Sequence, residues 1–175
     1  NSDGQLGDGT TTSTASPIKV NINEKISQIT LGWNHTCALL DNRKIKCWGD
    51  NSDGQLGDGT TTSSINPVLV NNINYATEVI AGSNHTCTIL HNKEIICWGN
   101  NFLGQIGHGI SYPWDEPNPT PVSGIDNAVE VSASSHHTCA LLNNNKVKCW
   151  GSNREYELGN SDISDSNVPI DVIFD

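Results

Sequence analysis

The 175-residue sequence lacks methionine and has few basic side chains, and each shortage narrows the functions to consider. Nine Lys and Arg residues oppose nineteen Asp and Glu residues, which gives a formal net charge of −10. Nucleic acids and anionic membrane surfaces require a basic footprint, so this balance argues against both as partners. No apolar run approaches the roughly 20 residues of a membrane-spanning helix, and we expect no membrane insertion. Without a methionine or a signal-peptide pattern, we expect residue 1 to be a processed or cropped start.

The polarity of the chain comes mainly from neutral side chains. Charged residues make up 16% and hydrophobic residues 35%, whereas 22 Asn, 16 Gly and 7 Pro give the chain a large stock of turn formers. This composition predicts short elements joined by many turns, in one ordinary domain or a stack of small units.

An internal repeat organises the sequence. Residues 1–13 recur letter for letter at 51–63, and residues 1–50 match residues 51–100 at 27 of 50 positions without a gap. We divide the chain into repeats at 1–50, 51–100 and 101–152, with a loop insertion at 110–120, and a partial repeat at 153–175. A period near 50 residues indicates one supersecondary unit per copy, stacked into a solenoid, a propeller or an array.

Each copy is predicted to form four short strands in a meander. In the second copy we expect strands at 67–70, 76–81, 85–90 and 94–98, with proline at the first position of the first strand. Helical periodicity of useful length is absent. Four antiparallel strands per roughly 50 residues is the content of one β-propeller blade. The predicted fold class is therefore all-β, with three full propeller repeats and a partial fourth.

The six cysteines form three pairs, each separated by ten positions around a turn. If the hairpin loop has an odd number of residues, the two cysteines face each other at a distance that a disulfide can span. We favour one disulfide per hairpin and therefore an oxidising compartment. Buried reduced thiols remain the alternative, and zinc is disfavoured because its sites use closer cysteine spacing. The pairs are Cys37 with Cys47, Cys87 with Cys97, and Cys139 with Cys149.

Glycine, tryptophan and histidine recur at fixed positions and make the repeat recognisable. The string CWGDNSDGQLGDGT, a later P-x-x-V and then G-x-N-H-T-C-x-x-L resemble the repeat of the regulator of chromosome condensation family. The third copy departs from the pattern at Ser134, and the fourth departs at Tyr156 and Glu157. The resemblance implies a seven-bladed propeller, and the paired cysteines are similar to those of secreted or cell-surface members.

Seven blades need about twice the length of this chain, and an open arc would leave two blade faces bare. Three explanations stay open: a crop from a longer chain, assembly of two or more copies into a homodimer or a head-to-tail stack, and an open arc. Three and a half units doubled would make seven, which suits a two-fold homodimer.

Most of the recurring side chains have a structural interpretation. We expect the histidines to hydrogen-bond neighbouring turns rather than bind metal, and the tryptophans to be buried against the next blade. No metal or cofactor site is predicted. Two glycosylation sequons begin at Asn34 and Asn84, but both overlap the repeat motif. The histidines are His35, His85 and His137, and the tryptophans are Trp48, Trp98 and Trp150.

The insertion at 110–120 is the one irregular segment. It places Tyr112, Trp114, Asp115 and Glu116 together, and aromatic residues beside acids suit a protein-binding anchor. The alternative is a tolerated insertion that packs on itself.

No catalytic motif emerges, so we expect a protein without enzymatic activity. The favoured function is a secreted or cell-surface, disulfide-linked propeller module that binds another protein or itself, in a surface or filament structure. The alternatives are a secreted enzyme inhibitor similar to the β-lactamase-inhibiting propellers, and guanine-nucleotide exchange on a small GTPase.

Overall fold

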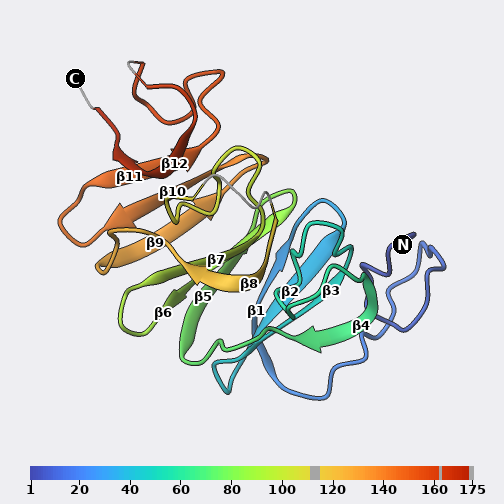
Figure 1. Cartoon of the computed structure of the whole chain (residues 1–175). Coiled ribbons are helices and arrows are strands. Elements are labelled where there is room, and N and C mark those ends of the chain that lie inside the picture. Colours follow the sequence, from blue (N-terminus) through green and yellow to red (C-terminus); the bar gives the residue numbers. More distant parts are fainter. Residues whose placement is uncertain (111–114, 162, 174–175) are drawn as a thin grey trace.

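The computed structural model describes residues 1–110, 115–161 and 163–173, which form twelve β-strands and no helix. The strands make three four-stranded antiparallel sheets, each ordered as its strands follow in the chain. Figure 1 shows the three sheets side by side like the blades of a fan. No described segment forms a helix able to cross a membrane. The strands are β1 (Ile26–Leu31), β2 (His35–Leu40), β3 (Ile45–Gly49), β4 (Ser64–Leu69), β5 (Ala76–Ala81), β6 (His85–Leu90), β7 (Ile95–Asn100), β8 (Asp115–Pro121), β9 (Ala128–Ala133), β10 (His137–Leu142), β11 (Val147–Gly151) and β12 (Ser166–Asp171).

Each sheet combines two copies of the repeat. Blade 1 takes β1–β3 from the first copy and its outer strand β4 from the second copy, and blades 2 and 3 follow the same rule. The partial fourth copy therefore supplies β12, which completes blade 3 instead of starting a further half-blade. Residues 17–20 are equivalent to 67–70 by the repeat but belong to no strand. The described chain is a partial propeller of three complete blades.

The strands of the second copy lie close to their predicted positions. β5 and β6 coincide with the predicted 76–81 and 85–90, whereas β7 begins one residue later than predicted and β4 begins three residues earlier. The expectation that Pro67 opens its strand is wrong, because it lies inside β4. β4 pairs only with β3, and an outer strand tolerates proline because it needs hydrogen-bond donors on one side alone.

The prediction of one disulfide per hairpin is confirmed. In the first hairpin Leu39 pairs with Ile45, and the Leu40 N–H donates to the Lys44 carbonyl at 2.9 Å, which leaves a loop of odd length. The two cysteines of each pair are direct partners in register, with Cα atoms 4.1 Å apart. Each disulfide therefore ties the two middle strands of one blade together.

The hydrophobic core lies between blades rather than inside one of them. One buried cluster joins Leu39 and Ile45 of blade 1 to Val79 and Trp98 of blade 2. A second cluster joins blade 2 to blade 3 in the same way. A single four-stranded sheet has no enclosed interior, so each blade buries its apolar side chains against its neighbours. The stability of each blade therefore depends on the blade beside it.

Candidate protein-binding surface

A loop between the third and fourth strands of one blade fastens the next blade. The backbone carbonyl of Gln55 accepts hydrogen bonds from Trp98 Nε1 at 2.9 Å and from Thr86 Oγ1 at 3.1 Å, both in blade 2. Gln105 holds Trp150 and Thr138 of blade 3 in the same way, and Gln5 holds Trp48 and Thr36 of blade 1. Gly57 lies two residues after Gln55, and a β-carbon at its position would lie 2.7 Å from Trp98 Nε1, so the loop passes close to the indole ring. The recurring tryptophans are therefore buried anchors for these loops.

The buried histidines form a second link between blades. His35 Nε2 lies 2.9 Å from Thr86 Oγ1 of the next blade. The single hydroxyl proton of Thr86 is donated to the Gln55 carbonyl, so His35 must donate from Nε2. His85 and Thr138 repeat the arrangement at 2.9 Å.

Burial keeps both linking histidines neutral. Desolvation lowers the pKa of His35 to about 4, and desolvation with repulsion from nearby histidines lowers the pKa of His85 to about 3. In the described structure, the Nδ1 atoms of both rings are buried without a hydrogen-bond partner, so a proton there would have no acceptor. The rings pack so closely on Gly32 and Gly82 that a β-carbon at either glycine would overlap the imidazole. Ser134 takes this position in blade 3, where His137 is only half-buried.

The inner strand β1 presents apolar side chains that no other strand of the described residues covers. Ile29 is 57% exposed, whereas its repeat equivalents Val79 and Val131 are 0% and 3% exposed. Leu31 is 69% exposed, whereas its equivalent Ala81 is 7% exposed. In blades 2 and 3 these positions are covered by the preceding blade, because β5 contacts β1 and β2, and β9 contacts β5 and β6. We call Ile26, Ile29, Leu31 and the adjacent Trp33 the open blade face.

A polar cavity borders the open blade face where the inner hairpins of the three blades converge. It encloses about 260 Å³, and its lining includes Trp33, Asn34, Ser83, Asn84 and His136. The Trp33 side chain is 75% exposed. The open blade face thus continues from apolar side chains into a rim of amides and hydroxyls, which is the composition of a protein-binding surface.

The predicted binding loop is only partly described. Tyr112 and Trp114 lie outside the described residues, whereas Asp115 and Glu116 open β8. Glu116 Oε1 lies 3.3 Å from His108 Nε2, and burial together with the nearby Asp53 carboxylate raises the pKa of Asp115. These two acids therefore have partners within the fold.

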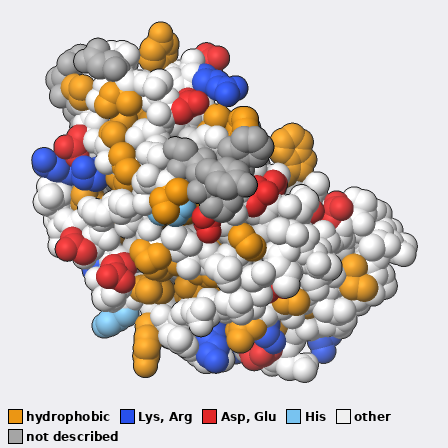
Figure 2. Space-filling view, in the orientation of Figure 1, with side chains coloured by type: hydrophobic (Ala, Val, Ile, Leu, Met, Phe, Trp, Pro, Cys, Tyr) orange, Lys and Arg blue, Asp and Glu red, His pale blue; other side chains and the backbone are white. Residues whose placement is uncertain are grey.

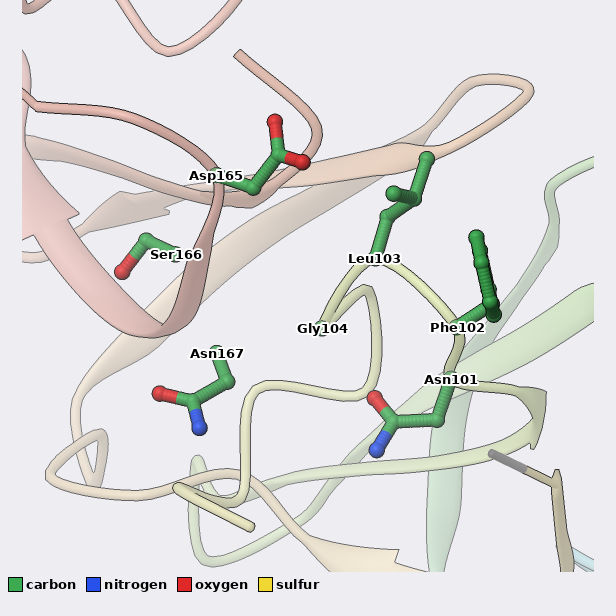
Figure 3. A pocket seen from close by; sticks show the side chains of 7 residues that line it. All are labelled: Asn101, Phe102, Leu103, Gly104, Asp165, Ser166 and Asn167. Atoms are coloured by element: carbon green, nitrogen blue, oxygen red, sulfur yellow. The ribbon is translucent and has the colours of Figure 1, made fainter. Parts of the chain in front are cut away.

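A cavity of about 290 Å³ lies between loop 101–104 and residues 165–167. Figure 3 shows Phe102 and Leu103 on the loop, with Asp165 and Asn167 on the opposite segment. Figure 2 shows that most of the visible face is white, because neutral polar side chains and backbone make up most of it. The lining of this cavity is mainly polar, and we assign it no ligand.

The two sequon asparagines occupy equivalent loops with different surroundings. Asn84 Nδ2 donates to Asp53 Oδ2 at 2.6 Å, so its amide nitrogen is already engaged. Asn34 is half-buried at the edge of the polar cavity. Within the described ranges, no three His, Cys, Asp or Glu side chains are grouped to hold a metal ion.

Sequence reasoning gave bare blade faces as one of three alternatives without naming their residues, and it missed the Gln5, Gln55 and Gln105 carbonyls. The carbonyls act through the backbone, so the side-chain pattern carries no direct signal of their role. The signal for the face was present in the repeat, because positions 29 and 31 are apolar and precede any covering blade in the described chain.

Comparison with known proteins places these features in a family. The pattern described as "Regulator of chromosome condensation (RCC1) repeat" matches residues 1–39, 47–89 and 94–141, and a second pattern of that description matches 26–55, 77–105 and 128–157. Protein pim1 of Schizosaccharomyces pombe is 34% identical over 55 residues, which are 31% of this chain and 10% of that protein.

Solved structures share the fold. Human WBSCR16 is 19% identical with a TM-score of 0.82, and the match covers 98% of this chain and 45% of that one. Prp20p from Saccharomyces cerevisiae is 22% identical with a TM-score of 0.80, and the match covers 99% of this chain and 45% of that one. The chain thus spans less than half the length of these relatives. The repeat matches and the three blades together show that the chain belongs to the regulator of chromosome condensation repeat family.

Proposed function

We propose that this chain is a non-catalytic, disulfide-linked propeller module of a secreted or cell-surface protein, and that it binds another protein or a second copy of itself. The observation that carries this proposal is the polar cavity where the inner hairpins of the three blades converge. Trp33 is 75% exposed at this cavity, among asparagine and serine side chains. An exposed aromatic side chain with polar neighbours suits a protein-binding surface.

The chemistry of the chain supports an extracellular setting and a protein partner. All six cysteines are paired in disulfides, and such bonds persist in oxidising compartments. Prp20p is described with its binding properties to Gsp1p and histones, and yeast RCC1 is described bound to Kap60. Protein binding by those relatives fits the same use of this scaffold, whereas their particular partners are not carried over.

Site-specific photo-crosslinking tests the proposal. A photoreactive side chain at Trp33, at the polar cavity, is compared with one at Leu69, on the outer strand β4, where 46% of the surface is exposed. We expect adducts with a protein of the extracellular fraction, or with a second copy, from position 33 and not from position 69. Equal labelling from both positions, or no adduct from position 33, would contradict the proposed function.

A further inference from the structure

The polar cavity at the inner hairpins is shared by all three blades. Each blade lines it with the turn that joins its two innermost strands, and the three turns occupy equivalent positions of the repeat. Their backbones are bonded to one another, because the Trp33 N–H donates to the Ser83 carbonyl at 3.0 Å and the Ser83 N–H donates to the Ser134 carbonyl at 3.3 Å. These N–H groups are therefore not available to pair with a peptide strand, and side chains must recognise a ligand. Those of the turns are Trp33, Asn34, Ser83, Asn84, Ser135 and His136.

Three further lining side chains hold the cavity wall in place. Asp50 accepts four hydrogen bonds, at 2.9–3.3 Å, from groups within residues 52–63. Asn100 Oδ1 accepts from Gln105 Nε2 at 2.7 Å, and Gln105 Oε1 accepts from the Leu103 N–H at 2.9 Å. The wall is thus ordered before a ligand arrives, which reduces the entropy that binding must cost.

The side chains of the turns, in contrast, have free polar atoms. Within the described ranges, the Asn34 amide and the hydroxyls of Ser83 and Ser135 make no hydrogen bond. In the same part of the structure the His136 ring has no hydrogen-bond partner, and Asn84 engages only its Nδ2. Because amides and hydroxyls supply both donors and acceptors, the cavity presents the two kinds of group at close spacing.

Trp33 is the one large apolar side chain among the described lining residues. It is 75% exposed. The equivalent residues of blades 2 and 3 are Ser83 and Ser135, so the repeat does not require an aromatic side chain at this position. The indole is therefore free to contact a ligand that has an apolar face as well as polar groups.

The lining argues against three other classes of small ligand. Phosphates and carboxylates are bound by Lys and Arg, and neither is among the described lining residues. A carboxylate has about four acceptor sites, and those of Asp50 are occupied, so none is left for a cation. A wholly apolar ligand would leave the amides and hydroxyls without partners, which costs free energy. A neutral ligand rich in hydroxyl groups remains.

We propose that this cavity binds a neutral sugar ring, carried in a glycan of the protein partner. This inference rests on the proposed function and names the group that the partner presents. Each sugar hydroxyl both donates and accepts, which matches the amides and hydroxyls of the turns. The C–H groups on one face of a pyranose ring form an apolar surface that stacks on the Trp33 indole. The volume of about 260 Å³ lies just below the range of about 300–1,000 Å³ usual for larger ligands, so it suits a single ring.

Titration of the purified chain with methyl glycosides tests the inference. The probes are the methyl glycosides of glucose, galactose, mannose and N-acetylglucosamine, with a blocked alanine peptide as the comparison ligand, and binding is measured by saturation-transfer difference NMR. The oxidised chain is prepared without glycosylation, because Asn34 and Asn84 lie in sequons and a glycan on either would block the cavity. We expect at least one glycoside to bind and the peptide not to bind.

Two substitutions in the cavity and one outside it locate the binding. Trp33→Ser should weaken glycoside binding about tenfold, because it removes the stacking surface. Serine fills the equivalent position in blades 2 and 3, so this variant should keep the wild-type urea midpoint. Asn34→Ala should weaken binding several-fold. Tyr75→Asn should leave it unchanged, because Tyr75 is 72% exposed at the opposite end of β5 and has Asn127 as its repeat equivalent.

Three results of the titration would overturn the sugar site. They are no binding by any glycoside, binding of the peptide instead, and equal affinity of the wild-type and Trp33→Ser chains. A loss caused equally by Tyr75→Asn would place the binding elsewhere and would also contradict the inference.

Crosslinking separates this inference from the proposed function. An aromatic photoreactive group at position 33 keeps a stacking surface there, and the extracellular fraction is used before and after enzymatic removal of its glycans. Adducts that form only with the untreated fraction support sugar recognition. Adducts that form equally with both fractions contradict sugar recognition and leave the proposed function standing.

Discussion

Replacing Thr86 with valine measures the energy of the link between adjacent blades. The Thr86 side chain is fully buried and its hydroxyl makes two hydrogen bonds, one donated to the Gln55 carbonyl at 3.1 Å and one accepted from His35 Nε2 at 2.9 Å. Valine has a similar shape and makes neither bond. The Gln55 carbonyl keeps its bond from Trp98 Nε1, so it is not left without a donor.

The repeat supplies a matched control at Thr36. This hydroxyl makes the equivalent bond to the Gln5 carbonyl, and no histidine among the described residues bonds it. Losing one neutral hydrogen bond costs about 1 kcal/mol, and a buried imidazole N–H without an acceptor costs about 1–3 kcal/mol more. We therefore expect Thr86→Val to lower the free energy of unfolding by about 2–4 kcal/mol, and Thr36→Val to lower it by about 1 kcal/mol.

Urea unfolding at pH 7.5 with the disulfides intact gives both values. Thr138→Val is an internal replicate, because Thr138 accepts from His85 and donates to Gln105. In the Thr86→Val background, the further change His35→Phe should cost much less than it costs alone, because the histidine has already lost its partner. Equal losses from Thr36→Val and Thr86→Val would refute the argument that the histidine bond links the blades.

Three further outcomes are expected. The pKa values of His35 and His85 in the folded chain lie below the ordinary 6.5, so the stability that these neutral rings contribute is complete above that pH and is lost as the pH falls towards the folded values. We expect each histidine to lower the free energy of unfolding by about 2 kcal/mol between pH 8 and pH 5. An unchanged urea midpoint over this range would contradict this expectation. Gly82→Ala should destabilise the chain by about 1–3 kcal/mol, because its β-carbon overlaps the His85 ring, and a wild-type melting temperature would exclude this packing. Replacing Cys87 and Cys97 together by alanine should cost about 2–3 kcal/mol in urea unfolding, since their disulfide closes a loop of about ten residues, and an unchanged midpoint would rule out that contribution.

The sequence carried the local structure well because each copy of the repeat constrains the others. The ten-residue spacing around Asn42 placed Cys37 opposite Cys47 on the condition that the hairpin loop is odd, and the structure meets that condition. The strand at 76–81 was predictable from its bounding turns. The start of β4 was not, because Ser64 and its neighbours resemble loop residues and join the sheet only by pairing with β3.

The features that depend on neighbouring blades were harder to predict. Ile29 and Val79 are similar apolar residues at the same repeat position, and their different exposure arises only from what lies beside them in space. The role of the Gln55 carbonyl could not be predicted either. Every residue type has a backbone carbonyl, so the identity of the residue does not indicate this role. The repeat predicts that blades stack, whereas their contacts give the histidines and tryptophans specific partners.

The sharing of strands between successive copies has a consequence for how such genes change length. Every sheet takes its outer strand from the following copy. One 50-residue period therefore contributes the strands of one blade even when it does not begin at a blade boundary. Duplication or loss of one whole period, with breakpoints anywhere in the unit, adds or removes one blade and leaves every remaining sheet with four strands. Because residues 1–13 and 51–63 are identical, a junction anywhere within this stretch leaves the protein sequence across the junction unchanged. The interlocked design therefore tolerates expansion and contraction at any phase of the repeat.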